Sequence, residues 1–199
     1  MGDVGIELYW LPVGAGEPTG LVRLSSRVYE AMSARRYGRV PQPLFHAALR
    51  IVTDQTEIVV EMAPVWASAA RERGVVAEGP VGMRWLGRFR WFRYEVRCWR
   101  GGSIPDLAYA VGPAIRVETD PSRVDLLLRA VPHVPITTWG LDEQRAGEMW
   151  NSNSLVSWAL STSGHDVSGM VPPDGGRAPG WAAGLVVAAR GARSGCAAS

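Results

Sequence analysis

Three residues of this 199-residue chain have the side-chain types that acyl-transfer chemistry requires: a histidine, a carboxylate and a hydroxyl. His46 lies near the start of the apolar run Phe-His-Ala-Ala-Leu, and Glu61 follows about fifteen residues later in Val-Glu-Met-Ala-Pro. Ser152 lies far downstream in Asn-Ser-Asn-Ser-Leu. A hydroxyl nucleophile needs a base to take its proton and a third group to orient that base, so these residues form a candidate triad.

Two predicted strands and one predicted helix would position this triad. Residues 46–52 and 57–62 flank a polar turn of hairpin length at 53–56, which places His46 and Glu61 almost opposite each other. Glu61 could then accept a hydrogen bond from the imidazole. Ser152 begins a helix predicted over 151–163, where the dipole and free N–H groups favour negative charge.

The same helix start supplies candidate substrate-binding groups. The backbone N–H of Ser152 would hold the oxyanion, with a second donor from Gln144 or Asn151, and Asn153 beside them. Two tryptophans, Trp139 and Trp181, are candidates for the walls of the cleft.

Each of these residues also has a simpler structural interpretation. A single strand histidine is more often a half-buried packing residue than a base, and Glu61 could be an ordinary edge-strand charge. Asn-Ser-Asn-Ser before an apolar run is what plain helix capping looks like. Trp139 and Trp181 fit a hydrophobic core equally well. Taken from the residue types alone, the structural interpretation is favoured over the triad.

The remaining pattern predicts a single α+β domain over residues 1–189, an antiparallel sheet packed against the helix that carries Ser152. A strand is expected at 4–13, a helix from Ser25 or Ser26 to Ala34, and an irregular segment at 63–83. The alternating stretch 88–99 predicts a strand with a bulge at Trp91-Phe92. Further predictions are a helix capped by Asp120-Pro121, a turn at 174–177 and a disordered tail at 190–199.

Composition excludes several classes of function. The chain has 21 basic residues, all arginine, against 19 acidic ones, so its net charge of +2 provides no overall field for nucleic acid or an anionic membrane. Arginines between aromatics in 88–99 could bind single-stranded nucleic acid, but an amphipathic strand is the favoured reading, and we expect no nucleic-acid partner. The arginine, alanine and glycine bias is typical of a high-GC, actinobacterial-type genome.

No cofactor, metal or membrane span is expected. Cys98 and Cys196 are far apart, and His133 and His165 lack acidic or cysteine neighbours at ligand spacing. No apolar run reaches the length of a transmembrane helix, and no signal-peptide pattern opens the chain. We therefore expect a cytoplasmic protein acting on a small-molecule, peptide or acyl substrate.

The segment Asn151-Ser-Asn-Ser-Leu155, followed by a helix and by Arg177-Ala-Pro-Gly-Trp181, resembles the nucleophile region of PPPDE-type peptidases. These enzymes have a circularly permuted papain-like fold and read Asn-Cys-Asn-Ser-Phe at this point. The histidine strand followed by the acidic strand is also similar to lecithin retinol acyltransferases of the NlpC-like superfamily. The resemblance covers residues 44–64 and 148–182, and it implies a hydrolase or acyltransferase with His46, Glu61 and Ser152 in its site.

This chain has serine where the family has cysteine. A hydroxyl is too weak an acid to be stored as an anion, so neutral His46 would remove its proton during attack on an amide, thioester or ester. The alternative is a papain-like pseudoenzyme that has lost its nucleophile and binds a peptide, lipid or protein partner.

Overall fold

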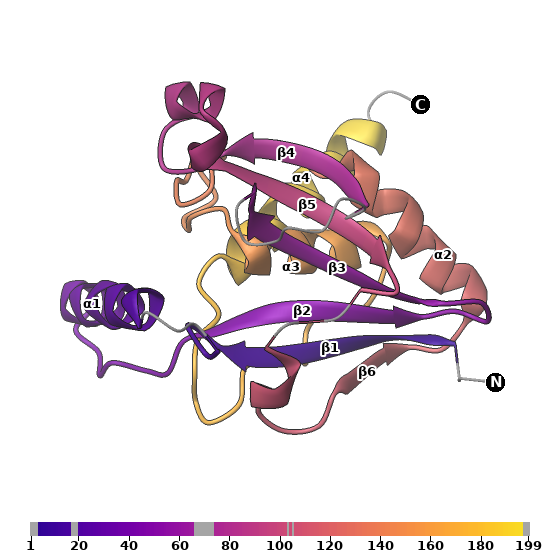
Figure 1. Ribbon diagram of the computed structural model, residues 1–199, viewed down its shortest axis with the longest axis horizontal. Helices are drawn as coiled ribbons and strands as arrows, with labels where there is room; N and C mark the ends of the chain where they lie inside the picture. Colours follow the sequence, from indigo (N-terminus) through magenta and orange to yellow (C-terminus); the bar gives the residue numbers. More distant parts are fainter. Residues whose placement is uncertain (1–3, 17–19, 66–73, 103, 105, 197–199) are drawn as a thin grey trace.

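The computed structural model describes residues 4–16, 20–65, 74–102, 104 and 106–196. Within these residues, six strands form one antiparallel sheet in the order β4-β5-β3-β2-β1-β6 (Figure 1). In chain order the strands are β1 (Gly5–Pro12), β2 (Phe45–Val52), β3 (Glu57–Pro64), β4 (Val75–Pro80), β5 (Arg93–Arg100) and β6 (Ile115–Glu118). The α+β class expected from the sequence is confirmed.

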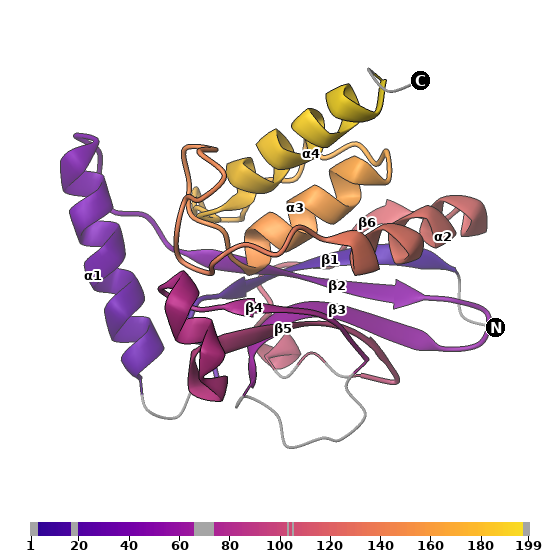
Figure 2. The ribbon, with the colours of Figure 1, turned by 90° about the horizontal axis from the view of Figure 1, so that it is seen from above.

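Four α-helices occur in the same residues: α1 (Leu21–Arg36), α2 (Pro121–Ala130), α3 (Ser152–Thr162) and α4 (Trp181–Cys196). Helices α2, α3 and α4 cover one face of the sheet, with α4 packed over α3, whereas α1 stands away from the sheet at one end of the molecule (Figure 2). Short 3₁₀ turns complete the fold: η2 (Arg84–Arg88), η3 (Arg90–Phe92), η4 (Leu107–Tyr109) and η5 (Val131–His133).

Alternating side chains divide the sheet into two faces. Phe45, Ala47 and Leu49 of β2 join the main core beneath α3, together with Leu155 and Leu160 of that helix. A smaller cluster on the opposite face consists of Leu11, Ala48, Val59 and Ile104. Most of the buried apolar area therefore lies between the sheet and α3.

The helix ends of α2 and α3 follow the predicted capping chemistry. Asp120 accepts a hydrogen bond from the Ser122 N–H, with Pro121 in the first turn of α2, and that helix ends before Pro132. Asn151 caps α3 in a capping box with Ser154. Helix α3 then ends at Thr162, with Ser163 as its C-cap, and Gly164 follows with a positive φ of 79°.

Helix α1 begins earlier than expected. It follows Gly20, and the hydroxyls of Ser25 and Ser26 donate to carbonyls inside the helix instead of capping it. Two of its side chains, Glu30 and Ala34, are buried. The helix is therefore placed by a few contacts and not by a wide apolar face.

The region between β3 and β5 also differs from the prediction. Strand β4 forms at Val75–Pro80, where we expected irregular chain, and residues 66–73 of that segment lie outside the described residues. The strand expected at 88–99 begins only at Arg93, because residues 84–92 form the turns η2 and η3. Adjacent Trp91 and Phe92 break the two-residue alternation that a strand requires.

At the other end, α4 continues to Cys196, past residue 190 where we expected a disordered tail to begin. One alanine and two arginines of residues 190–196 favour helix while two glycines oppose it, so the extension follows from propagation of a helix already nucleated on α3. Residues 197–199 lie outside the described residues. The turn expected at 174–177 is present, with Asp174 at φ 55° and Gly175 at φ 62°.

In the part of the chain that the structure describes, no helix is both long enough and apolar enough to cross a lipid bilayer.

Candidate functional site

The side chain of Asn153 ties the start of α3 to the backbone on both sides of His46. Its Oδ1 accepts a hydrogen bond from the Ala47 N–H at 2.7 Å, and its Nδ2 donates to the carbonyls of Phe45 at 3.0 Å and Pro179 at 2.9 Å. Asn153 is 2% exposed. Ser152, one residue earlier, is thereby brought to the histidine end of β2 from more than a hundred residues away.

These three hydrogen bonds, which we call the Asn153 staple, lie where the pairing of β2 with β3 has ended. The ladder between β2 and β3 runs from Val52↔Glu57 to Leu49↔Val60 and stops before His46. Beyond that point the β2 edge is completed by Asn153 and by Arg177, whose carbonyl accepts from the Phe45 N–H at 2.8 Å. The approach to the α3 N-terminus therefore lies where β2 and β3 have separated (Figure 1).

His46 is held neutral by its surroundings. Burial lowers its pKa from 6.5 to about 4. In β2 its side chain follows the alternation of Ala48 and pairs with Leu11 of β1, so it leaves the sheet on the face opposite the covering helices. Among the described residues no hydrogen bond or ion pair involves the imidazole.

Glu61 lies on the same face as His46 but has a different partner. Its carboxylate accepts from the guanidinium of Arg97 on β5 at 3.0 Å, and Arg97 also donates to Glu95 at 3.0 Å. Glu61 is paired across the sheet with Arg97, and the register does not set it opposite His46. The predicted hydrogen bond from His46 to Glu61 is absent from the described residues, because β3 turns toward β5 at this point.

Ser152 has the environment expected of the first residue of a helix. It is half-buried, and within the described chain neither its hydroxyl nor its backbone N–H makes a hydrogen bond. The next two N–H groups, of Asn153 and Ser154, donate to Asn151 Oδ1. One main-chain donor thus remains available beside the Ser152 hydroxyl.

Two of the three expected side-chain oxyanion donors, Asn151 and Asn153, are engaged elsewhere. Asn151 donates its Nδ2 to the Pro179 carbonyl at 2.8 Å while its Oδ1 caps the helix, and Asn153 is occupied by the staple. Gln144 contributes its backbone carbonyl, which accepts from Arg190 of α4. As oxyanion donors, Asn151 and Asn153 would have to break bonds that position α3, so their observed role is structural.

Both candidate tryptophans pack against the core on the helix-covered side. The ring of Trp181 lies 5.2 Å from that of Trp10, tilted by 52°, and Trp139 meets Tyr94 edge-on at 5.9 Å. Trp139 also forms isolated bridges to Val81 and Trp150, which link the end of β4 to the residue before the α3 cap. The contacts of both tryptophans therefore agree with the interpretation as core residues and not as walls of a cleft.

A second serine, histidine and glutamate meet at the far end of α3. The hydroxyl of Ser163 lies 2.9 Å from His165 Nδ1, and His165 Nε2 lies 3.8 Å from a Glu118 oxygen. The Ser163 hydroxyl also contacts the helix carbonyl of Ala159 at 2.6 Å. Because Ser163 and His165 are buried and the hydroxyl is already bonded to the helix, this cluster closes the helix end and offers no accessible nucleophile.

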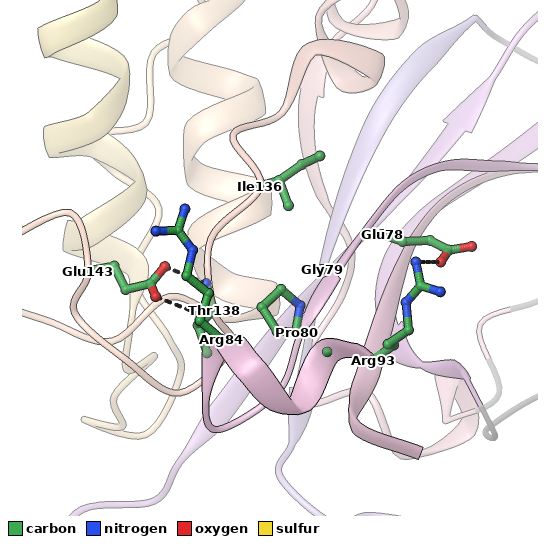
Figure 3. A pocket seen from close by; sticks show the side chains of 9 residues that line it. Glu78, Gly79, Pro80, Arg84, Arg93, Ile136, Thr138 and Glu143 are labelled. Carbon is green, nitrogen blue, oxygen red and sulfur yellow. Dashed lines mark hydrogen bonds and ion pairs between the residues drawn. The ribbon is translucent and has the colours of Figure 1, made fainter. Parts of the chain in front are cut away.

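A polar cavity of about 230 Å³ lies near the end of β4 (Figure 3). Glu143 lies on one side, accepting from the N–H and hydroxyl of Thr138, which lowers its pKa, and an ion pair of Glu78 with Arg93 lies on the other. The lining is completed by Gly79, Pro80, Arg84, Gly87 and Ile136. The cavity contains none of the predicted triad residues, and its opposite charges leave it with little net field.

No group of three or more histidine, cysteine, aspartate or glutamate side chains is arranged to hold a metal ion in the described residues. No protein-family model matches this sequence, and neither does any curated protein or solved structure.

Sequence reasoning named Asn153 only as a candidate substrate-binding residue and missed Arg97, although these two residues organise this region most strongly. Asn153 looked like part of a helix cap, and nothing in its neighbours indicated that it would bond to a strand more than a hundred residues earlier. Arg97 looked like one member of an alternating arginine face. Alternation along the strand indicates that Arg97 shares a face with Glu95. Only the β3–β5 register shows that Arg97 also lies opposite Glu61.

Proposed function

We propose that this chain is a hydrolase or acyltransferase of permuted papain-like arrangement, acting on an amide, thioester or ester through an acyl-enzyme on Ser152. The observation that carries this proposal is the Asn153 staple, because its bonds to Phe45 and Ala47 bracket His46 and bring the preceding residue, Ser152, to the same end of β2.

The proposed reaction uses the groups available at the α3 N-terminus. Ser152 Oγ attacks the substrate carbonyl while His46 takes its proton, and the C–O bond to Ser152 forms as the carbonyl becomes an oxyanion. The free Ser152 N–H and the helix dipole stabilise that oxyanion. His46 then returns the proton to the leaving group, and water or a second acceptor releases the acyl group by the reverse steps.

Burial supports one requirement of this mechanism and limits another. A pKa of about 4 keeps His46 neutral at pH 7, as a base for serine must be. The same shift makes it a weak base, so an approaching substrate must raise its basicity in the complex. With Glu61 bound to Arg97, its proposed orienting role requires a rearranged ion pair. Because the His46 side chain leaves the sheet on the face opposite α3, proton transfer from Ser152 requires a local rearrangement at the start of β2 as well.

The Glu61–Arg97 ion pair specifically favours a second candidate, a papain-like domain without catalysis that binds a peptide, lipid or protein partner. In that case His46 is a packing residue and Ser152 is a helix-start residue, as the bonds of Asn151 and Asn153 independently suggest.

A fluorophosphonate probe separates the two candidates. If Ser152 is a nucleophile, the probe labels wild type, and Ser152→Ala and His46→Asn abolish labelling together with hydrolysis of a panel of p-nitrophenyl esters and acyl amides. Glu61→Gln then reports whether the carboxylate orients the base, because loss of an orienting group lowers turnover by orders of magnitude. Ser161→Ala, which changes a serine on the last turn of the same helix, is the matched control. Equal rates from wild type and Ser152→Ala would exclude the acyl-enzyme and leave the binding domain.

A further inference from the structure

One end of the molecule exposes apolar side chains that the fold does not use. On α1, Leu24 is 62% and Met32 is 69% exposed, with Val28 between them. In the turns η2 and η3, Trp91 is 73% exposed. The neighbouring Met83, Trp85, Phe89 and Phe92 are exposed as well. Large apolar groups gathered in this way mark interaction surfaces.

The exposed stripe of α1 points away from the body of the protein. Leu24, Val28 and Met32 recur every four residues and so lie along one side of the helix. Glu30 and Ala34, the buried side chains of α1, lie on roughly the opposite side. Glu30 anchors that side through Arg39, Arg177 and the Gln42 N–H. The stripe is thus left free by the contacts that hold the helix.

Helix α1 and the η2–η3 turns lie toward the same end of the long axis in both views, α1 beyond the start of β2 and the turns next to the end of β4 (Figures 1 and 2). We call Leu21–Arg36 together with Met83–Phe92 the basic apolar end. It contains seven of the 21 basic residues of the chain but only one of the 19 acidic ones. That one is Glu30, which is buried and paired. Outside these segments, Glu143 lies near Arg84 and offsets its charge. The other six arginines still leave a local positive field that the near-neutral total charge conceals.

We infer that the basic apolar end binds the surface of a lipid bilayer that contains anionic phospholipids. Tryptophans and aliphatic side chains insert at the level of the headgroups, while arginines attract the anionic lipids around them. Arg84, Arg88 and Arg90 alternate with the aromatics of η2 and η3, so both interactions arise from one short segment. This inference does not depend on catalysis by Ser152.

Two other occupants fit the surface less well. A second copy of the chain would bring seven arginines against seven arginines, which opposes association. Single-stranded nucleic acid would need several open aromatic faces, but the Arg88 guanidinium lies 5.4 Å from the Trp85 ring centre and 4.7 Å from that of Phe89. Of the exposed rings of η2 and η3, this leaves those of Trp91 and Phe92. The aliphatic stripe of α1 offers no ring on which a base could stack.

The test is flotation of the full chain with vesicles of phosphatidylcholine, with or without phosphatidylglycerol. We expect wild type to float with the anionic vesicles, and to bind at least about tenfold less to neutral vesicles or at high salt. Trp91→Ala and Met32→Ser should each weaken binding about tenfold, and Arg88→Gln with Arg90→Gln should do the same. Leu126→Ser, at an exposed position of α2, is the matched control and should bind like wild type.

Circular dichroism and thermal melts confirm that these exposed substitutions leave the fold intact. Failure of folded wild type to bind anionic vesicles would overturn the inference, as would unchanged binding by all three variants. Tight, salt-sensitive binding of a labelled single-stranded oligonucleotide that vesicles do not displace would assign the surface to nucleic acid. Sedimentation showing a wild-type dimer that Met32→Ser dissociates would assign it to self-association.

Discussion

Helices α1 and α3 differ in how much of each is buried against the rest of the protein. Helix α1 is the longer, with 16 residues against 11. Of its side chains described from Val22 onward, those of Glu30 and Ala34 are buried, whereas eight consecutive residues of α3, from Asn153 to Leu160, are buried. Helix α3 lies between the sheet and α4, and its first turn is bonded to β2. Helix length therefore says little about how firmly a helix is held, and the contacts of a few residues decide it.

The two helices also serve different proposed roles. The fixed start of α3 carries the hydroxyl and N–H of the proposed reaction, which require a constant geometry. The exposed stripe of α1 belongs to the proposed membrane-binding end, where a loosely held element can adapt to a lipid surface. The predictions below test whether the α3 region is rigid and α1 loosely attached.

The largest effect is expected from Asn153→Ala. The change leaves the Ala47 N–H and the Phe45 carbonyl without their Asn153 partner in a buried site, while the Pro179 carbonyl keeps its bond from Asn151. The free energy of unfolding should fall by about 3 kcal/mol. Ser152→Ala is the neighbouring control and should change stability by less than about 0.5 kcal/mol. Urea denaturation measures both. Equal midpoints for the two variants would show that the staple does not hold α3.

The contact between α3 and α4 provides the second test. A Cβ at Gly184 would lie 2.1 Å from Ser157 Oγ and 2.2 Å from the Ser154 carbonyl oxygen, so Gly184→Ala should force the helices apart and cost about 2 kcal/mol. At Gly191, on the same helix, no atom lies within 4 Å of such a Cβ. Gly191→Ala should therefore raise stability by about 0.5 kcal/mol through helix propensity. A stabilising Gly184→Ala would contradict close packing of α3.

The third test measures the free energy of unfolding against pH, because burial at the start of β2 keeps His46 neutral. Its pKa is about 4 in the folded state against 6.5 unfolded, so the unfolded chain binds the proton first as pH falls. Stability should be complete above pH 6.5 and should decline toward pH 4 by about 1 kcal/mol per pH unit. His46→Asn should flatten this slope, leaving the part due to buried His165, whose pKa is also lowered by burial. An unchanged slope would mean that His46 is not buried in solution.

The smallest global effect is expected from Glu30→Gln, which weakens the ion pairs of α1 with Arg39 and Arg177. Because few other contacts hold α1, the helix should open locally while the sheet remains folded, with a global loss below about 1 kcal/mol. Hydrogen exchange should show α1 amides exchanging at least about tenfold faster and α3 amides unchanged. Leu126→Ser, far from Glu30, serves as control. Cooperative loss of the whole fold would show that α1 is integral to the core.

Much of the fold follows from local sequence. Alternation predicted β1, β2 and β3, and Asp120-Pro121 and the asparagine cap predicted the starts of α2 and α3, since each of these signals lies within a few residues. The secondary-structure predictions failed where residues distant in the sequence determine whether a segment forms a helix, a strand or a turn. Residues 84–92 alternate charge and apolar character yet form turns, and residues 190–196 have no apolar face of their own yet continue α4.

The candidate site could be predicted only in its parts. The sequence places His46 on a strand and Ser152 at a helix start, because both depend on local periodicity and capping. The register between strands decides the ion-pair partner of each carboxylate, and Glu61 pairs with Arg97 of β5 instead of contacting His46. Composition likewise determined the charge of +2, but only the tertiary structure gathered seven arginines and the unused aromatics at one end. Local preferences act over a few residues, whereas these pairings require segments far apart in the chain to be packed together.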